Sequence, residues 1–211
     1  MDLGALSSSF QRRFEEKTAA REKGLSAARR SIRSSANAIR AIHRGEFDQA
    51  HGLMEESRTA LQSGGEALER HPDVYFAGFL QDAQKEYAEA RLTEAVVKGT
   101  DLPSPDDLGV QLAPYLNGMA ETIGEARRAI LDLLRRGDVD QGERILSAME
   151  DMFSVLVSID FPDAITGNLR RSTDVARGIM ERTRGDLSIT LVQRNLQDAL
   201  ERHARDVLRD R

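Results

Sequence analysis

Helix-forming residues dominate this chain, and this feature restricts its possible fold more than any other. Ala, Leu, Arg and Glu prevail, aromatic residues make up only 5% of the sequence, and runs of β-branched residues are almost absent. The prevailing residues favour helices, whereas strands need the β-branched and aromatic residues that are scarce here. Two of the 5 prolines, Pro103 and Pro105, fall between strongly helical stretches. The composition therefore predicts an all-α protein.

In seven segments of the chain, apolar residues recur every three or four positions, which predicts seven helices. Glycine, proline and aspartate mark the breaks between them, and Gly64-Gly65 indicates an interruption or bend inside the second. The predicted helices cover about residues 6–44, 47–69, 72–99, 111–136, 140–159, 165–184 and 187–208. Neither a fixed-period repeat nor a low-complexity linker occurs. We therefore expect a single domain, residues 1–211, forming a seven-helix bundle or layer.

Several classes of protein are disfavoured by what the sequence lacks. There is no cysteine, which rules out disulfides, Cys–zinc sites and thiol nucleophiles. Residues 1–10 do not resemble a signal peptide, and no stretch approaches the roughly 20 apolar residues of a membrane span. No Glu-x-x-His pair, P-loop, Rossmann fingerprint or nucleophile elbow is present. We expect a soluble, cytoplasmic protein that contacts no membrane.

The first predicted helix carries an uneven distribution of charge. The whole chain has a net charge of −5, yet residues 21–44 hold seven Lys or Arg and one acid, Glu22. Solvation or intersubunit ion pairs explain such a stripe, but so does binding to a phosphate backbone, for which arginine is well suited. Because aromatic residues are not interleaved, binding would be largely independent of sequence. The candidate RNA-binding residues are Arg21, Arg29, Arg33, Arg40 and Arg44.

Two pairs of glutamates form the second candidate site. Glu86 and Glu89 are three residues apart, and Glu121 and Glu125 are four apart, so each pair shares one side of a helix. Helical periodicity places all four outside the apolar stripes, which favours an ordinary solvated face. Four carboxylates on two helices could instead hold a hard cation such as Mg²⁺ and support phosphodiester chemistry. Small neighbours, including Gly118 and Gly124, would let the two helices approach closely.

Several segments, taken in order, resemble the translin family, and the translin-associated factor X (TRAX) branch more than translin itself. The resemblance extends from about residue 11 into the last helix. Each motif is modest alone, but their joint order is fairly specific. The matching segments are Glu86–Ala90, Tyr115–Glu125, Gly137-Asp138, Asn168–Val175 and Thr183–Leu187.

The resemblance implies a seven-helix all-α layer that assembles into closed, hollow oligomers, commonly octamers, enclosing nucleic acid. It implies a metal-dependent endoribonuclease, a hydrolase of single-stranded RNA, that uses Mg²⁺ or Mn²⁺. Catalytic and metal-binding roles carry over to Glu86, Glu89, Glu121 and Glu125. Glu121 stands where the TRAX branch usually has Asp, so its carboxylate is one methylene further from the backbone. The compact chain resembles a prokaryotic version that forms a homo-oligomer.

Two other functions remain open at this stage. Translin lacks the full acidic set and binds RNA without cleaving it, so the first alternative is a non-catalytic oligomer that binds single-stranded RNA or DNA. The second is a structural helical scaffold whose charges only solvate its surface. Salt-sensitive RNA affinity separates the scaffold from the other two. If the four glutamates cluster, their mutual repulsion should raise their pKa values in the metal-free protein.

Overall fold

The computed structural model describes residues 2–209, together with the side-chain surroundings of residues 2–206. Within this range the chain forms α-helices and no β-strand, which confirms the all-α prediction. Six helices are long, and three consist of about one turn. Their bounds are α1 (Leu3–His43), α2 (Phe47–Leu68), α3 (Pro72–Tyr75), α4 (Phe79–Lys98), α5 (Pro105–Leu108), α6 (Leu112–Arg135), α7 (Val139–Ser158), α8 (Asp163–Thr166) and α9 (Leu169–Arg209).

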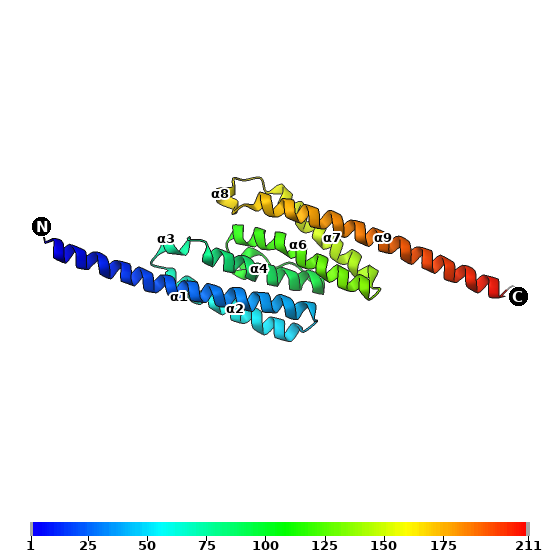
Figure 1. Cartoon of the computed structure of the whole chain (residues 1–211), viewed down its shortest axis with the longest axis horizontal. Helices are drawn as coiled ribbons and strands as arrows, with labels where there is room; N and C mark the ends of the chain where they lie inside the picture. The colour runs from blue at the N-terminus through cyan, green and yellow to red at the C-terminus, as the bar shows by residue number, and fades with distance from the viewer. Residues whose placement is uncertain (1, 210–211) are drawn as a thin grey trace.

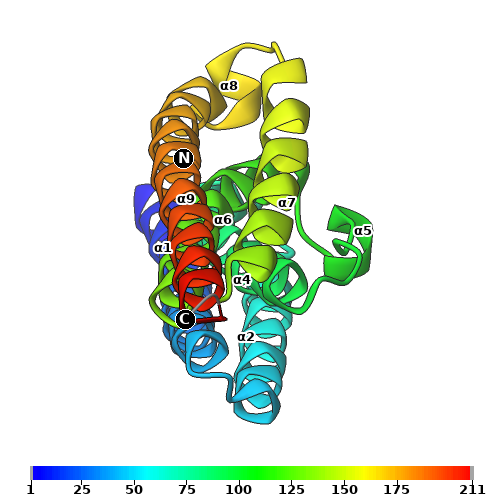
Figure 2. The ribbon, with the colours of Figure 1, turned by 90° about the vertical axis from the view of Figure 1, so that its right-hand side faces the viewer.

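The six long helices stack as three successive pairs. Helices α1 and α2 form a hairpin, α4 and α6 make up the middle, and α7 and α9 cover the far side of α6 (Figures 1 and 2). Helix α4 therefore contacts α1 and α2 on one side and α6 on the other. The main apolar core runs through these contacts and includes the fully buried Tyr87, Ile123 and Met149. This arrangement places α4 and α6 at the centre of the molecule.

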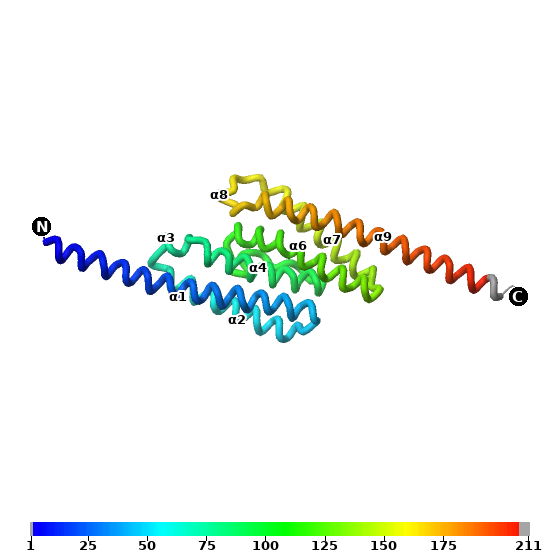
Figure 3. Tube along the Cα trace, in the orientation of Figure 1, coloured from blue at the N-terminus to red at the C-terminus, as the bar shows by residue number. Residues whose placement is uncertain are grey.

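The last helix differs from its prediction. The sequence indicated two helices divided at Gly185-Asp186, but α9 continues through these residues for 41 residues in all (Figure 3). Leu187 is buried, and the Asp186 carboxylate lies 2.8 Å from the Arg127 guanidinium of α6. These contacts offset the roughly 1 kcal/mol that a glycine costs inside a helix. The chain breaks instead at Gly167, which has a φ of 63°.

Two further predicted boundaries also shift. Helix α2 runs uninterrupted through Gly64, where a Cβ would lie 3.1 Å from Leu80 Cδ1 and 3.2 Å from Ala27 Cβ. Glycine is needed there for close packing and not for a turn. Conversely, the third predicted helix is divided into α3 and α4 at Gly78, whose φ of 106° is one that L-residues rarely adopt.

Both end helices extend beyond the body of the molecule. The first buried residue of α1 is Gly24, and past Leu187 no described side chain of α9 is buried. In Figure 1 the two termini lie at opposite ends of the longest axis. We call residues 3–20 of α1 the N-terminal arm and residues 189–206 of α9 the C-terminal arm. No helix within residues 2–209 combines the length and apolarity needed to cross a membrane.

Candidate metal centre

A close approach between α4 and α6 creates the site. A Cβ on Gly118 of α6 would lie only 2.7 Å from the Lys85 carbonyl oxygen and 3.1 Å from the Glu89 nitrogen of α4. Because no larger residue fits at this separation, the two backbones meet at Gly118. The Thr122 hydroxyl donates to the Gly118 carbonyl at 2.9 Å. Glu121, less than one turn beyond Gly118, is thereby set beside α4.

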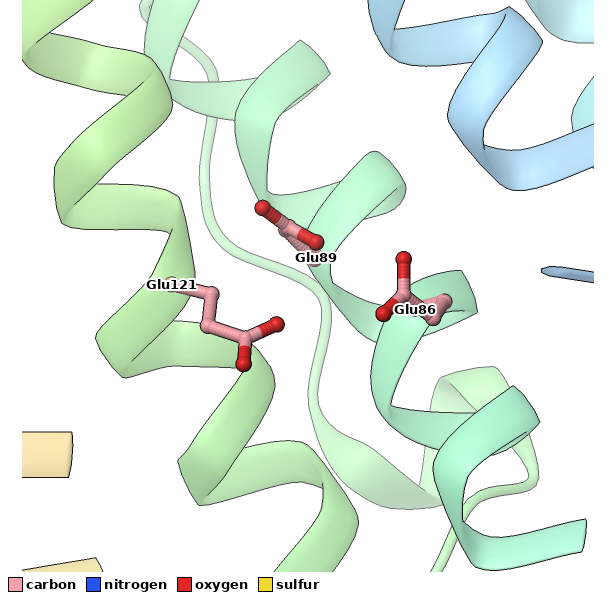
Figure 4. Close-up of side chains that lie close together, drawn as sticks. All are labelled: Glu86, Glu89 and Glu121. Carbon is pink, nitrogen blue, oxygen red and sulfur yellow. The ribbon is translucent and has the colours of Figure 1, made fainter. Parts of the chain in front are cut away.

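Three of the four predicted glutamates converge across this contact. One carboxylate oxygen from each of Glu86, Glu89 and Glu121 lies within 4.8 Å of the others, and Figure 4 shows the three side chains pointing toward one another. Oxygen ligands on opposite sides of Mg²⁺ lie roughly 4 Å apart, given metal–oxygen distances of about 2.0–2.1 Å. The three carboxylates therefore need little movement to share one ion. Their role as metal ligands stays a prediction.

Of the four glutamates, Glu89 lies in the surroundings that most disfavour an ionised carboxylate. It is 8% exposed, and the solvated face that periodicity favoured for it is wrong. Its carboxylate makes no hydrogen bond or ion pair with a side chain elsewhere in the described part of the chain. Burial, followed by the negative charges of Glu121, Glu86 and Glu125, raises the pKa of Glu89 to about 8. Such a group is stabilised by a proton or by a cation.

Lys85 supplies one positive charge to this cluster. Its Nζ lies 2.6 Å from Glu121 Oε1 and 3.3 Å from Glu86 Oε1. Burial alone would lower the pKa of Lys85, but the carboxylates of Glu121 and Glu86 raise it overall, so the amine stays protonated. One ammonium cannot balance three carboxylates if all are ionised. The sequence reasoning missed Lys85, although it directly precedes Glu86.

Glu125 lies at the edge of the cluster and contacts α1 instead of α4. Its Oε2 is 2.5 Å from Nε2 of the buried His43 and 3.9 Å from an Arg128 nitrogen. The hydrogen bond from His43 outweighs burial and lowers the pKa of Glu125. The expected rise in pKa is therefore found for Glu89 and reversed for Glu125. His43 was also missed, because the two residues are 82 positions apart.

The five predicted arginines are all exposed, four of them on α1 and Arg44 directly after its last residue. At about 100° per residue, Arg29 and Arg40 project roughly 40–60° from the direction of His43. Arg33 lies instead at a hollow between α1 and α2, which also contains Glu55 and Glu56. Arg44 pairs with Glu46 at 2.5 Å, and Arg21 pairs with Glu22. No such ion pair is found for Arg29 or for Arg33 among the residues described. Their RNA-binding role stays a prediction.

Comparison with known proteins gives consistent relatives over most of the chain. No family model matches it. It is 31% identical over 191 residues to "Uncharacterized protein MJ0175" of Methanocaldococcus jannaschii, covering 88% of this chain and 83% of that protein. The crystal structure of AfC3PO and the structure of its complex with duplex RNA each match with a TM-score of 0.82 and 34% identity, over 89% of this chain and 97% of theirs.

A more distant solved structure supports the fold alone. The crystal structure of apo-NeC3PO matches with a TM-score of 0.76 and 22% identity, over 90% of this chain and 97% of that one. The coverage of these matches shows that the likeness extends over most of this chain, and not only over the centre around α4 and α6.

Proposed function

This chain belongs to the translin family as a prokaryotic TRAX-like member, and on that basis we propose that it is a metal-dependent endoribonuclease that cleaves single-stranded RNA inside a homo-oligomeric shell. One observation carries the proposal. Glu86, Glu89 and Glu121 converge, and the Glu89 carboxylate is buried without a partner among the described side chains. A fold needs no such group for stability, because an unpaired buried carboxylate is costly.

The donor set suits Mg²⁺ or Mn²⁺, since hard divalent cations prefer carboxylate oxygens. When bound, such an ion would neutralise charge on the scissile phosphate and lower the pKa of the attacking water. Glu86, Glu89 and Glu121 would hold it. Glu125 stays ionised through its hydrogen bond with His43 and adds negative charge at the edge of the site. The longer Glu121 side chain, in place of the usual Asp, reaches the other two carboxylates within 4.8 Å.

Lys85 and the arginine stripe act on the substrate in this proposal. With a divalent cation held by Glu86 and Glu121, the Lys85 ammonium would no longer be needed to balance these carboxylates and would be free to pair with a phosphate oxygen of the RNA. Arg29, Arg33 and Arg40 then hold the RNA backbone along α1, with Arg21 and Arg44 at the two ends of the stripe. The AfC3PO structure with duplex RNA supports nucleic acid as the ligand of this fold. Contacts of this kind are electrostatic and weaken as salt rises.

The two arms support assembly of several copies, with an octamer as the favoured size. Large apolar side chains recur every three or four residues on each arm and are 41–69% exposed. A stripe of this kind on a projecting helix gains stability when a second helix covers it. The residues are Leu3, Leu6, Phe10 and Phe14 on the N-terminal arm and Ile189, Val192, Leu196 and Leu200 on the C-terminal arm.

A second candidate function is a non-catalytic oligomer that binds single-stranded RNA or DNA. The contact of Lys85 with Glu86 and Glu121 favours it, because an ammonium already neutralises part of the cluster without a metal. Binding would then persist in chelator, and no metal would produce cleavage. The arginine stripe would serve this function unchanged.

Cleavage of a labelled single-stranded RNA in Mg²⁺, in Mn²⁺ and in EDTA separates the two functions. We expect metal-dependent cleavage that falls by at least about 100-fold in Glu89→Gln, the upper range for losing even a partner of a metal ligand. Glu94→Gln is the matched control, because Glu94 lies on α4 but pairs with Lys98. Full cleavage by Glu89→Gln would refute the site. RNA binding without cleavage in any metal would establish the second function.

A further inference from the structure

A hollow of about 360 Å³ adjoins the carboxylates between α6 and the first turns of α9. Glu89, Glu121 and Ala120 line one side of it, and Arg171, Val175 and Ile179 line the other. Its volume is at the lower end of the roughly 300–1,000 Å³ typical of ligand sites. The space therefore suits a single small unit and not a helix or a duplex.

The α9 side of the hollow combines a cation with an apolar wall. Val175 is 58% exposed, which is unusual for a valine inside a concavity, and Ile179 is half-buried beside it. Arg171 is exposed and pairs with no acid within the described residues. Three other arginines of α9 do form pairs: Arg170 with Asp160 at 3.3 Å, Arg184 with Glu150 at 2.6 Å and Arg194 with Asp140 at 3.3 Å. Arg171 is thus available to an anion from outside.

A buried amide fixes the position of Arg171 relative to the carboxylates. Asn117 of α6 is 8% exposed and accepts a hydrogen bond from the Ser172 hydroxyl at 2.8 Å. Its Nδ2 donates to the carbonyls of Ala113 at 2.9 Å and Thr166 at 2.8 Å. Asn117 lies about one turn before Glu121, so the same helix sets both sides of the hollow. The backbone that carries Arg171 is therefore held in place before any ligand binds.

We infer that this hollow is the subsite for the nucleotide adjoining the scissile phosphate, with Arg171 binding a phosphate and Val175 and Ile179 contacting the ribose and base. This inference rests on the proposed function. The planar guanidinium matches phosphate oxygens with two parallel hydrogen bonds. The carboxylates opposite repel a phosphate and so orient it toward Arg171. The Ser172 hydroxyl, which also lines the hollow, already donates to Asn117, and the side chains of Val175 and Ile179 carry no hydrogen-bonding group, so the subsite accepts any base.

The test compares Arg171→Ala with Arg170→Ala, its neighbour on α9, which faces Asp160. Binding of a labelled single-stranded oligouridylate is followed by fluorescence anisotropy in EDTA at several salt concentrations, with the oligomer mass checked by light scattering. We expect Arg171→Ala to weaken binding by about tenfold, as for a lost charge-assisted hydrogen bond. The slope of log K against log salt should fall by about 0.7 for each lost phosphate contact. Arg170→Ala should leave both unchanged.

Two further variants make the test sharper. Arg171→Lys keeps the charge and should restore the salt slope while regaining only part of the affinity, because it lacks the bidentate fork. Val175→Glu should weaken binding by repelling the phosphate without changing the oligomer mass. Equal binding and equal salt slope for Arg171→Ala and Arg170→Ala would overturn the subsite, even if the wild-type protein cleaves RNA. A change in oligomer mass for Arg171→Ala would also overturn it, by making Arg171 an assembly contact.

The experiments distinguish failure of the subsite from failure of the nuclease. Selective loss of binding in Arg171→Ala, in a protein that cleaves in no metal, supports the subsite and removes only the catalytic proposal. Selective loss of binding in a protein that does cleave supports both. In that case KM for RNA should rise in Arg171→Ala more than kcat falls, because the residue binds the chain beside the reacting phosphate.

Discussion

At the scale of single residues, the site is defined by Glu89, a carboxylate that the fold buries close to two others. Glu89 converges with Glu86 and Glu121, and it is the one of the three that is buried, so its own charge is the least screened by water. Without a divalent cation, protonation of Glu89 relieves the repulsion among the three carboxylates at the lowest cost in free energy. The protonation of one side chain therefore links the stability of the metal-free protein to pH.

The metal-free protein should lose stability as pH rises from about 4.5 to 8. Below this window Glu89 is protonated in both the folded and the unfolded chain. Within it the unfolded chain releases the proton while the folded chain, with its pKa of about 8, retains it, so the free energy of unfolding falls. A shift of this size corresponds to at most about 5 kcal/mol. Above the window the loss is complete.

Urea unfolding in EDTA at several pH values measures this effect as the difference between wild type and Glu89→Gln. Between pH 4.5 and about 8, the free energy of unfolding of Glu89→Gln should rise relative to that of the wild type. That of Glu94→Gln should show the same pH dependence as the wild type. If wild type and Glu89→Gln show the same pH dependence, Glu89 is ionised in the folded protein and the metal-free cluster has a different structure.

The sequence predicted the glutamates of this site but not their partners. Spacing within a helix identified both pairs, yet it could not show that Lys85 faces Glu121 or that His43 reaches Glu125, because those contacts join different helices. Periodicity also placed Glu89 on a solvated face. It failed because it assumes one buried side, whereas α4 is covered by α1 and α2 on one side and by α6 on the other.

At the scale of elements, one glycine controls the distance between α4 and α6. Gly118 lets the Lys85 carbonyl and the Glu89 nitrogen approach to within 2.7 Å and 3.1 Å of where a Cβ would stand. Any side chain at this position pushes the helices apart and separates Glu121 from Glu89. The convergence of the carboxylates thus depends on a residue that carries no functional group.

Gly118→Ala should destabilise the protein by about 1–3 kcal/mol, the usual cost of an overpacked contact. The effect opposes helix propensity, which favours alanine by roughly 1 kcal/mol. Gly124→Ala is the matched control on the same helix, since its Cβ would meet only Ile179 Cδ1 at 3.8 Å, an ordinary contact. Thermal unfolding of both variants measures the difference. Equal stability would show that α4 and α6 are not held at the distance described here.

Glycines also explain which helix boundaries could be predicted. Gly45, Gly99 and Gly137 end helices with φ values of 75°, 72° and 78°, and the sequence placed all three breaks correctly. Gly64 and Gly185 lie inside continuous helices, although the sequence indicated breaks there. A glycine serves equally for a left-handed turn and for close packing. Which use applies is decided by the neighbouring helix, and the local sequence does not contain that information.

At the scale of the whole molecule, the two projecting arms carry apolar side chains that no other described part of the subunit covers. Each exposes an apolar stripe, and the body of the same subunit leaves both uncovered. Assembly therefore follows from the surface of one subunit. Oligomers were expected from the resemblance to the translin family, but the predicted break at Gly185 hid the length of the last helix, which equals that of the first.

Phe10→Glu and Leu196→Glu should each reduce the mass of the assembly. Covering a side chain of this size contributes about 1.5–3 kcal/mol, and a charge in its place reverses that gain. Gln11→Glu adds a charge to the adjacent polar face of the same arm and should leave the mass unchanged. Light scattering coupled to gel filtration provides the mass, and circular dichroism verifies that the helices persist. An unchanged mass for both apolar variants would mean that the arms do not hold the copies together.

The uninterrupted course of α9 has a structural consequence. Arg171 and Leu200 lie 29 residues apart on one helix, which is about 44 Å at 1.5 Å per residue. The same helix lines the hollow beside the carboxylates near one end and carries the apolar stripe of the C-terminal arm near the other. Under the proposed assembly, one continuous element therefore joins the nucleotide subsite to the contact between copies.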